Sequence, residues 1–234
     1  MTFAPSGSAI GMTMREVVAP DGTSLPVRVA RAPGATATLV LAHGAGTSMD
    51  HPSLVRLQQA LAASGTTVVT FDFPYRARGR GMPDRLAVLI AAYAAVLAVI
   101  RADGPGRLFV GGRSMGGRVA SHLAASGATV DGLVFLGFPL HPPGTPGTTR
   151  AAHLAAIEAP SLFVQGTRDT FARWDLLTMV VDRLPAATLH AIADADHGFH
   201  VPKRAGRTDA EILDEIVRVI TSFIAGRGAL GASR

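Results

Sequence analysis

Residues 108–118 constrain the fold of this chain more than any other stretch. An apolar run, Leu108–Val110, ends in Gly-Gly-Arg-Ser-Met-Gly-Gly, and a helix-favouring segment follows at 119–125. A serine at so sharp a strand-to-helix turn sits at a strained backbone angle, and side chains two positions before and after it would collide with neighbouring backbone. The serine also begins a helix, whose first N–H groups favour negative charge. The stretch predicts an exposed, reactive serine, although a glycine-rich turn that binds a phosphate, or nothing, has the same pattern.

Short apolar runs alternate with helix-favouring segments over most of the chain. Predicted strands are residues 38–42, 67–71, 108–111, 132–137, 160–165 and 188–192, and predicted helices are 52–63, 86–100, 119–125 and 209–224. A hairpin with strands at 15–19 and 25–30 around Pro20-Asp-Gly-Thr23 precedes them. Such alternation is typical of an α/β fold, here a mostly parallel central sheet of about seven or eight strands with helices on both faces.

Length and composition narrow the class of protein. The 234 residues suit a single domain, 1–234, with flexible ends expected at 1–14 and 226–234. Cysteine is absent, which excludes disulfides, a zinc–thiolate site and a cysteine nucleophile. The net charge is +5, but no block of Lys or Arg stands out, and one Trp and two Tyr offer little for base stacking. We therefore expect no nucleic-acid partner.

Two segments bear on location and assembly. The first residues lack the basic and apolar regions of a signal peptide, so we expect a cytoplasmic location. The uncharged run 86–100 is shorter than the roughly 18 residues of a membrane span, and its alanines favour a packed helix. No membrane partner is expected. The weak polar face of this helix makes it a candidate surface for a homodimer.

A serine hydroxyl is a poor nucleophile at neutral pH and needs a base to take its proton and an acid to orient that base. Ser114, Asp169 and His197 each follow the end of a predicted strand. Strand ends on one edge of a parallel sheet are neighbours in space, so these three positions can converge. They are our candidate catalytic residues.

Other assignments of the acid and the base stay open from the residues alone. Asp169 could instead cap the next helix, and Asp194 or Asp196 could serve as the acid. His200 is the nearest competitor of His197 as the base.

An oxyanion needs two backbone N–H donors. Met115, directly after the serine, offers one, and the turn His43-Gly-Ala-Gly46 offers the second through Ala45, with Gly46 as the fallback. We expect His43 to brace this loop rather than to take part in the chemistry.

Charged and aromatic side chains near these strand ends are candidates for substrate binding, and Gly46 is a further candidate. The basic set could form a rim for a carboxylate or phosphate, or could be ordinary surface of an arginine-rich chain; it comprises Arg76, Arg78, Arg80, Arg113, Lys203 and Arg204. The aromatic and aliphatic set could line an acyl pocket or belong to the core; it comprises Phe73, Tyr75, Phe138, Leu140, Phe171 and Phe199.

Three phrases together resemble a known family. They are Leu41-Ala-His-Gly-Ala-Gly46, Gly111-Gly-Arg-Ser-Met-Gly-Gly117 and Phe163-Val-Gln-Gly-Thr-Arg-Asp169. The chain is similar, over 36–225, to the α/β-hydrolase superfamily and to its small cap-less branch near the dienelactone hydrolases. It looks like bacterial predicted hydrolases that are similar to animal proteins described as testis-expressed or as NSL-complex subunits. The resemblance implies Ser114 as nucleophile, Asp169 as acid and His197 as base, in the family's chain order.

The resemblance also limits the substrate. Serine stands where true dienelactone hydrolases have cysteine, so their specific activity does not carry over. Family members often insert a lid between the strands that here end at Gly137 and begin near Pro160, and this interval is too short for one. We therefore expect a shallow, open site.

The leading hypothesis is a serine carboxylesterase that acts on small, accessible esters through an acyl-enzyme, with no metal or organic cofactor. One alternative is a hydrolase-fold binding or scaffold protein without catalysis, because a fold does not fix a function. Another is an acyltransferase or peptidase that uses the same triad.

Overall fold

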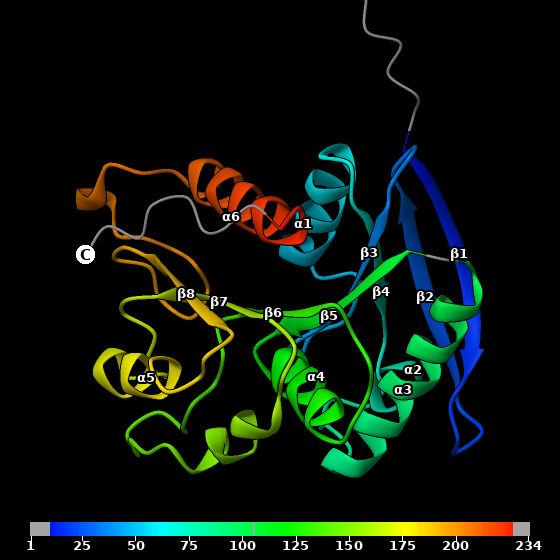
Figure 1. Cartoon of the computed structure of the whole chain (residues 1–234), viewed down its shortest axis with the longest axis horizontal. Helices are drawn as coiled ribbons and strands as arrows, with labels where there is room; N and C mark the ends of the chain where they lie inside the picture. The colour runs from blue at the N-terminus through cyan, green and yellow to red at the C-terminus, as the bar shows by residue number, and fades with distance from the viewer. Residues whose placement is uncertain (1–9, 105, 227–234) are drawn as a thin grey trace, which may run out of the picture.

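Eight strands form one sheet in the order β1-β2-β4-β3-β5-β6-β7-β8 in the computed structural model, which describes residues 10–104 and 106–226 (Figure 1). β1 pairs antiparallel with β2, and β2 pairs antiparallel with β4. Every other neighbouring pair is parallel. The predicted α/β fold with a mostly parallel sheet is confirmed.

The strands are β1 Gly11–Val18, β2 Ser24–Arg31, β3 Ala37–Ala42, β4 Thr67–Phe71, β5 Arg107–Arg113, β6 Gly132–Leu136, β7 Ser161–Gly166 and β8 Ala187–Ile192. The helices are α1 Pro52–Ala63, α2 Pro74–Ala77, α3 Leu86–Ala102, α4 Met115–Ala125, α5 Trp174–Val181 and α6 Asp209–Ile224, with 3-10 helices η1 Thr149–Ala156 and η2 Lys203–Ala205.

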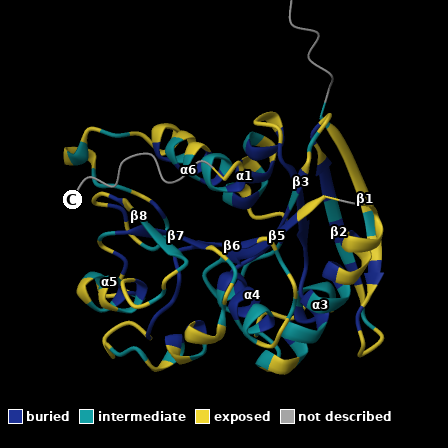
Figure 2. Ribbon diagram, in the orientation of Figure 1, coloured by how far each residue is buried: buried dark blue, intermediate teal, exposed yellow. Residues whose placement is uncertain are grey.

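Helices cover both faces of the sheet. α1 and α6 lie on one face, and α3, α4 and α5 lie on the other (Figure 1). Side chains alternate between the two faces along each strand, so Leu39 and Leu41 of β3 pack with α1 and α6, whereas Val40 packs with α3 and α4. The middle strands are buried on both sides (Figure 2), which explains why they read as continuous apolar runs.

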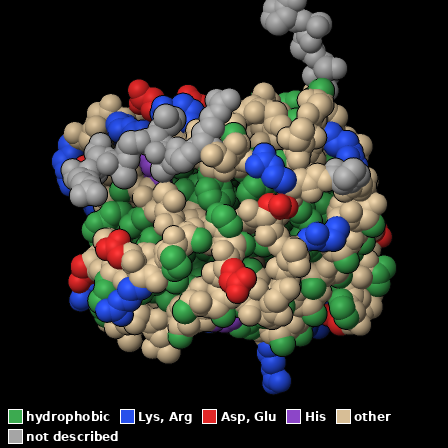
Figure 3. Space-filling model, in the orientation of Figure 1, with side chains coloured by type: hydrophobic (Ala, Val, Ile, Leu, Met, Phe, Trp, Pro, Cys, Tyr) green, Lys and Arg blue, Asp and Glu red, His purple; other side chains and the backbone are tan. Residues whose placement is uncertain are grey.

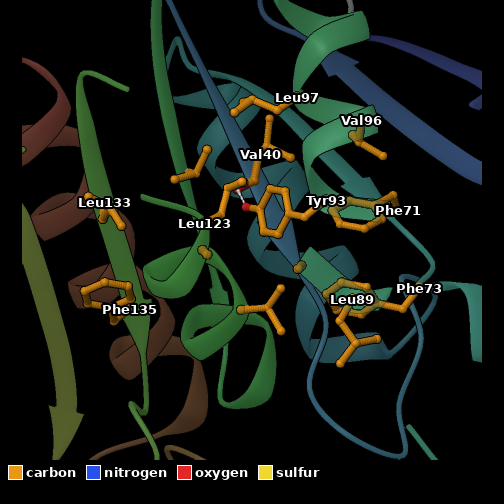
Figure 4. Close-up of a cluster of buried hydrophobic side chains, with 14 of the residues drawn as sticks. Val40, Phe71, Phe73, Leu89, Tyr93, Val96, Leu97, Leu123, Leu133 and Phe135 are labelled. Atoms are coloured by element: carbon orange, nitrogen blue, oxygen red, sulfur yellow. Dashed lines mark hydrogen bonds between the residues drawn. The ribbon is translucent and has the colours of Figure 1, made fainter. Parts of the chain in front are cut away.

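Tyr93 ties α3 to the strands that carry the site. Its ring is fully buried among the side chains of Figure 4. Its hydroxyl lies 2.7 Å from the carbonyl oxygen of Val40 and 2.8 Å from that of Gly111, and it accepts the N–H of Gly111 at 2.9 Å. One hydroxyl thus bridges β3 and β5, and burial raises its pKa so that it keeps its proton.

The ends of the chain differ from expectation. Residues 11–14 were expected to be flexible, but they belong to β1, where Met12 pairs with Ala30 and Met14 with Arg28. The side chains of Met12 and Met14 are exposed, so this segment is held as a strand by backbone pairing with β2. Such pairing leaves no apolar pattern in the sequence from which it could be predicted. Gly226 is described and exposed, and the rest of the expected flexible ends, 1–9 and 227–234, lies outside the described residues.

The helix predicted at 86–100 is α3, which buries Leu89, Tyr93, Val96 and Ile100 against the sheet and leaves Val99 exposed. The homodimer through its outer side stays a prediction. Within 10–104 and 106–226, none of the helices combines the length and apolar character that crossing a bilayer would require.

The loops after β3, β5, β7 and β8 all lie at one edge of the sheet, because these strands run parallel. In residues 137–160, all of which are described, the chain between β6 and β7 forms only η1, so no cap domain covers this edge.

Candidate active site

The turn between β5 and α4 has the geometry that its glycines predict. Ser114 adopts φ 49° and ψ −114°, a conformation that L-residues rarely take. A Cβ added to Gly112 would lie 2.5 Å from the carbonyl oxygen of Ala42, and one added to Gly116 would overlap the same oxygen. The backbone N–H of Ser114 donates to Leu136 of β6 at 2.9 Å. The serine is thus held rigidly at the sheet edge, at the start of a helix.

Three side chains from different strand ends meet at this turn. The Nε2 atom of His197 lies 2.9 Å from Ser114 Oγ, and its Nδ1 lies 2.7 Å from Asp169 Oδ2. A carboxylate oxygen accepts, so Nδ1 carries the proton and Nε2 is free to accept the serine hydroxyl. Asp169 is 4% exposed. The arrangement can pass the serine proton to the imidazole.

The carboxylate of Asp169 has two further donors. The Phe171 N–H donates to Oδ1 at 2.7 Å, and Gln165 Nε2 donates to Oδ2 at 2.5 Å. Gln165 is fully buried, and its own oxygen accepts the Phe138 N–H at 2.8 Å. This role of Gln165 was not predicted; the available signal was a glutamine directly after the apolar run Leu162–Val164 of β7.

Neither aspartate that competes with Asp169 reaches His197. Asp194 is exposed, and Asp196 Oδ1 accepts the N–H groups of Gly198 and His200 at 2.7 and 3.0 Å. Asp196 therefore shapes the loop that carries the imidazole. The competing base, His200, is exposed and lies 3.3 Å from Asp209.

Arg113, inside the turn, supports the same loop. Its Nη2 donates to the carbonyl oxygen of His197 at 2.6 Å, and its guanidinium lies 5.2 Å from the centre of the Phe199 ring. Burial lowers the pKa of Arg113, while the charges of Asp169 and Asp196 oppose that shift. The guanidinium thus contacts both His197 and Phe199 and stabilises the loop that carries them.

The loop after β3 is braced as expected. His43 is buried; its Nδ1–H donates to the carbonyl oxygen of Gly44 at 2.8 Å, and its Nε2 accepts the Phe73 N–H at 3.2 Å. Burial lowers its pKa, which favours the neutral ring. Ala45 is exposed beside Ser114, and in the described hydrogen-bond network its N–H has no acceptor. Met115 begins α4, where N–H groups have no partner within the helix.

A cleft of about 480 Å³ opens on Ser114 and His197. Apolar side chains of α1 and α6 form part of its walls, and Phe171 and Phe199 also line it near the imidazole. The expectation of a shallow site is wrong. The absence of a lid does not make the site shallow, because two helices of the core fold stand on either side of it.

The predicted substrate-binding residues divide into two groups. Arg113, Phe171 and Phe199 line the cleft. The others do not. Gly46 is an exposed loop residue, and Arg76 donates to the carbonyl oxygen of Arg80. The remaining four are fully buried in the core on the opposite face of the sheet: Phe73, Tyr75, Phe138 and Leu140.

The basic residues predicted to form a rim around the substrate site do not come together there. Arg78 pairs with Asp21 at 2.8 Å and with Asp84 at 2.9 Å, so its charge is already matched. Lys203 and Arg204 are exposed on η2 and do not line the cleft.

A second serine–histidine contact lies away from the cleft. Ser121 Oγ is 2.7 Å from His153 Nε2 and donates to the carbonyl oxygen of Arg118, also at 2.7 Å. Its proton is therefore engaged by the backbone. The ring of His122 stacks on that of His153, with 3.6 Å between the ring centres. Across the residues that the structure describes, no carboxylate forms a hydrogen bond with His153. This pair has no acid and does not make a triad.

Metal ligands are not gathered anywhere in 10–104 and 106–226: no group of three or more His, Asp or Glu side chains there is placed to hold an ion.

The sequence and the fold both match known proteins. A family model described as an alpha/beta hydrolase domain matches residues 35–225. Among solved structures, an α/β serine hydrolase without a lid from Xanthomonas campestris superposes with a TM-score of 0.72 at 20% identity, over 99% of this chain and 100% of that one.

Two further structures place the fold in the same group. A dienelactone hydrolase from Anabaena variabilis has a TM-score of 0.73 at 18% identity, over 93% of this chain and 98% of that one. An esterase from Pyrococcus furiosus has a TM-score of 0.74 at 18% identity, over 97% and 96%. These likenesses confirm the expected cap-less fold near the dienelactone hydrolases.

Proposed function

The chain belongs to the α/β-hydrolase domain family, and on that premise we propose that it is a serine hydrolase, specifically a carboxylesterase, with Ser114 as its nucleophile. The observation that carries the proposal is the continuous contact from Ser114 Oγ through the His197 ring to Asp169, with distances of 2.9 and 2.7 Å. A hydroxyl, a base and a buried acid in this order are the parts that acyl transfer requires.

In the first half of the reaction, Ser114 Oγ attacks the acyl carbon of the ester while His197 Nε2 takes its proton. Asp169 holds the ring and stabilises the imidazolium. In this proposal the N–H groups of Met115 and Ala45 bind the oxyanion. The carbon–oxygen bond to the alcohol then breaks, and the alcohol leaves with the proton from Nε2.

In the second half, water replaces the alcohol. His197 takes a proton from the water, which attacks the acyl-enzyme, and the serine leaves with that proton as the acid is released. One ester and one water give one acid and one alcohol. The chain's own groups suffice for each proton transfer, so the proposal assigns no cofactor.

The proposed partner is a small molecule rather than a nucleic acid. On the face drawn in Figure 3, over the part that the described residues cover, Lys and Arg side chains are scattered among hydrophobic and polar surface and form no continuous basic track. We expect the protein to act in the cytoplasm and away from membranes.

The direct test compares two serines that each contact a histidine. Ser114→Ala lowers kcat for short p-nitrophenyl esters by about 10⁴-fold or more, because the nucleophile is lost. The control is Ser121→Ala, which removes the hydroxyl beside His153 and leaves turnover in place. Thermal melts show whether each variant is folded.

Labelling by a fluorophosphonate gives an independent reading. We expect stoichiometric modification of the wild type at Ser114 and none in Ser114→Ala. Full turnover in Ser114→Ala would overturn the nucleophile. A folded wild type that neither reacts with the probe nor turns over any ester would instead identify a binding or scaffold protein.

A further inference from the structure

The cleft beside Ser114 continues as a slot between two helices. This slot is lined by Leu54 and Leu57 of α1 and by Ile212, Leu213 and Ile216 of α6. These side chains recur at helical spacing, so each helix turns one apolar face toward the other. All but Leu213 are buried, at 2–6% exposure.

The slot has a closed inner end and a polar mouth. One turn further along each helix, Leu61 and Ile220 are fully buried in the same cluster and no longer line the space. The mouth carries His51, Arg56 and Asp209, which are exposed. Among the described residues that line the slot and its mouth, the charged side chains therefore lie at the mouth.

The guanidinium of Arg113, which lines the cleft near Ser114 and His197, already has partners. Arg113 donates to the His197 carbonyl and stacks on Phe199, so it offers no unmatched charge to the inner slot. A substrate group that enters between α1 and α6 therefore meets hydrocarbon, and a charged or strongly polar group would lose its hydration there without a partner.

We infer that the slot binds an extended hydrocarbon chain on one side of the scissile ester, so that the enzyme prefers medium-chain esters to acetates. The inference rests on the proposed function for the placement of the ester at Ser114. It extends that proposal from small esters in general to one chemical class.

The length of the slot sets the chain length. Measured along α6 from the mouth at Asp209 to the inner residue Ile216, the slot is roughly 10 Å deep at 1.5 Å per residue. An extended chain advances roughly 1.2 Å per bond, by analogy with the three backbone bonds of an extended residue, so about eight bonds fill it. The whole cleft, of which the slot is one part, has a volume of about 480 Å³, within the range of sites that enclose a small ligand.

Two ester series show which side of the ester enters. One series lengthens the acyl group of p-nitrophenyl esters from acetate to dodecanoate, and the other lengthens the alcohol of alkyl acetates, all below micelle-forming concentrations. We expect kcat/KM to rise up to about eight carbons in one series, by on the order of 100-fold between four and eight carbons, since each buried methylene contributes about fourfold. The rising series identifies the occupant as acyl group or alcohol. Two flat series would overturn the inference.

Matched variants on α6 locate the effect. Leu213→Trp fills the slot and should lower the ratio of kcat/KM for the eight-carbon over the four-carbon ester by at least about tenfold. Val219→Trp is the control, since Val219 is half-buried on the same helix but outside the slot. If Leu213→Trp does not fold, Leu57→Phe takes its place. An unchanged ratio in a folded slot variant would count against the inference.

Binding without turnover separates this inference from the proposed function. Calorimetry on Ser114→Ala with sodium butyrate and sodium octanoate should show tighter binding of octanoate, which Leu213→Trp in the same background removes. If Ser114→Ala keeps its activity but binds octanoate in the slot, the nucleophile is wrong and the slot stands. If Ser114→Ala is inactive and shows no preference for octanoate, the slot is wrong and the nucleophile stands.

Discussion

Replacing Gln165 with leucine tests whether the buried hydrogen bonds behind the triad matter as the structure indicates. The side chain is fully buried, and leucine has nearly the same volume. Gln165 Nε2 donates to Asp169 at 2.5 Å, and its oxygen accepts the Phe138 N–H at 2.8 Å. The substitution removes both bonds and leaves a carboxylate one donor short and a backbone N–H without a partner.

The free-energy cost of losing each of these two hydrogen bonds can be approximated. A hydrogen bond to a charged group contributes about 1.5–3 kcal/mol, and a buried unsatisfied N–H costs about 1–3 kcal/mol. We expect Gln165→Leu to lower the free energy of unfolding by about 3–5 kcal/mol. If about 1.4 kcal/mol of the lost bond also orients Asp169 against the imidazolium, kcat falls about tenfold. KM should not change, because Gln165 does not line the cleft.

A second buried glutamine provides the control. Gln58 is also fully buried, but its amide donates to the neutral carbonyls of Arg28 and Val68, and its own oxygen has no hydrogen-bond partner among the described residues. Gln58→Leu should therefore cost about 1 kcal/mol and leave kcat unchanged.

Urea unfolding at neutral pH measures the free energies, and steady-state kinetics on one p-nitrophenyl ester measures kcat and KM. Equal losses of stability in the two variants, together with an unchanged kcat in Gln165→Leu, would show that the hydrogen bonds of Gln165 do not support the triad. A loss of stability with no change in kcat would leave Gln165 a structural residue rather than one that positions Asp169.

Two further predictions follow from packing and titration. Gly112→Ala should lower the free energy of unfolding by about 3 kcal/mol and abolish turnover, because the added Cβ would lie 2.5 Å from Ala42 O, whereas Gly147→Ala, with open space around it, should change neither; urea unfolding and ester turnover check both. Burial and the neighbouring His122 lower the pKa of His153 to about 4 from 6.5, so the unfolded chain binds the proton more readily and stability is lost as pH falls from about 6.5 toward 4. After a discount for partial exposure, His153→Gln should reduce the loss between pH 7 and pH 5 by about 1 kcal/mol in urea titrations, and an identical loss in wild type and variant would contradict the assignment.

Much of the fold could be predicted because its signals are local. α1, β4 and α6 begin and end at the residues predicted, since each has either helical or continuous apolar patterning and clear ends. α6, for example, begins after Thr208, whose side chain and that of Glu211 form a reciprocal cap. α5 was not predicted, and β1 was predicted too short, because neither pattern stands out from the loops around it.

The candidate triad could be predicted for a related reason. Ser114, Asp169 and His197 each follow a strand, and the parallel arrangement brings those strand ends to one edge. The supporting contacts could not be predicted. Arg113 was placed on a basic rim, but its guanidinium turns back to His197, a contact between positions 84 residues apart.

The strained turn around Ser114 and the succession of strands and helices along the chain follow from the sequence, because backbone sterics and periodicity act between neighbouring residues. Which apolar side chains line the cleft depends on tertiary packing. Tyr75 and Phe138 are as apolar as Leu57 and Ile216, yet the first two are buried in the core and the last two line the cleft. The face of the sheet on which a side chain lies, and the space left between α1 and α6, depend on packing between segments far apart in the chain.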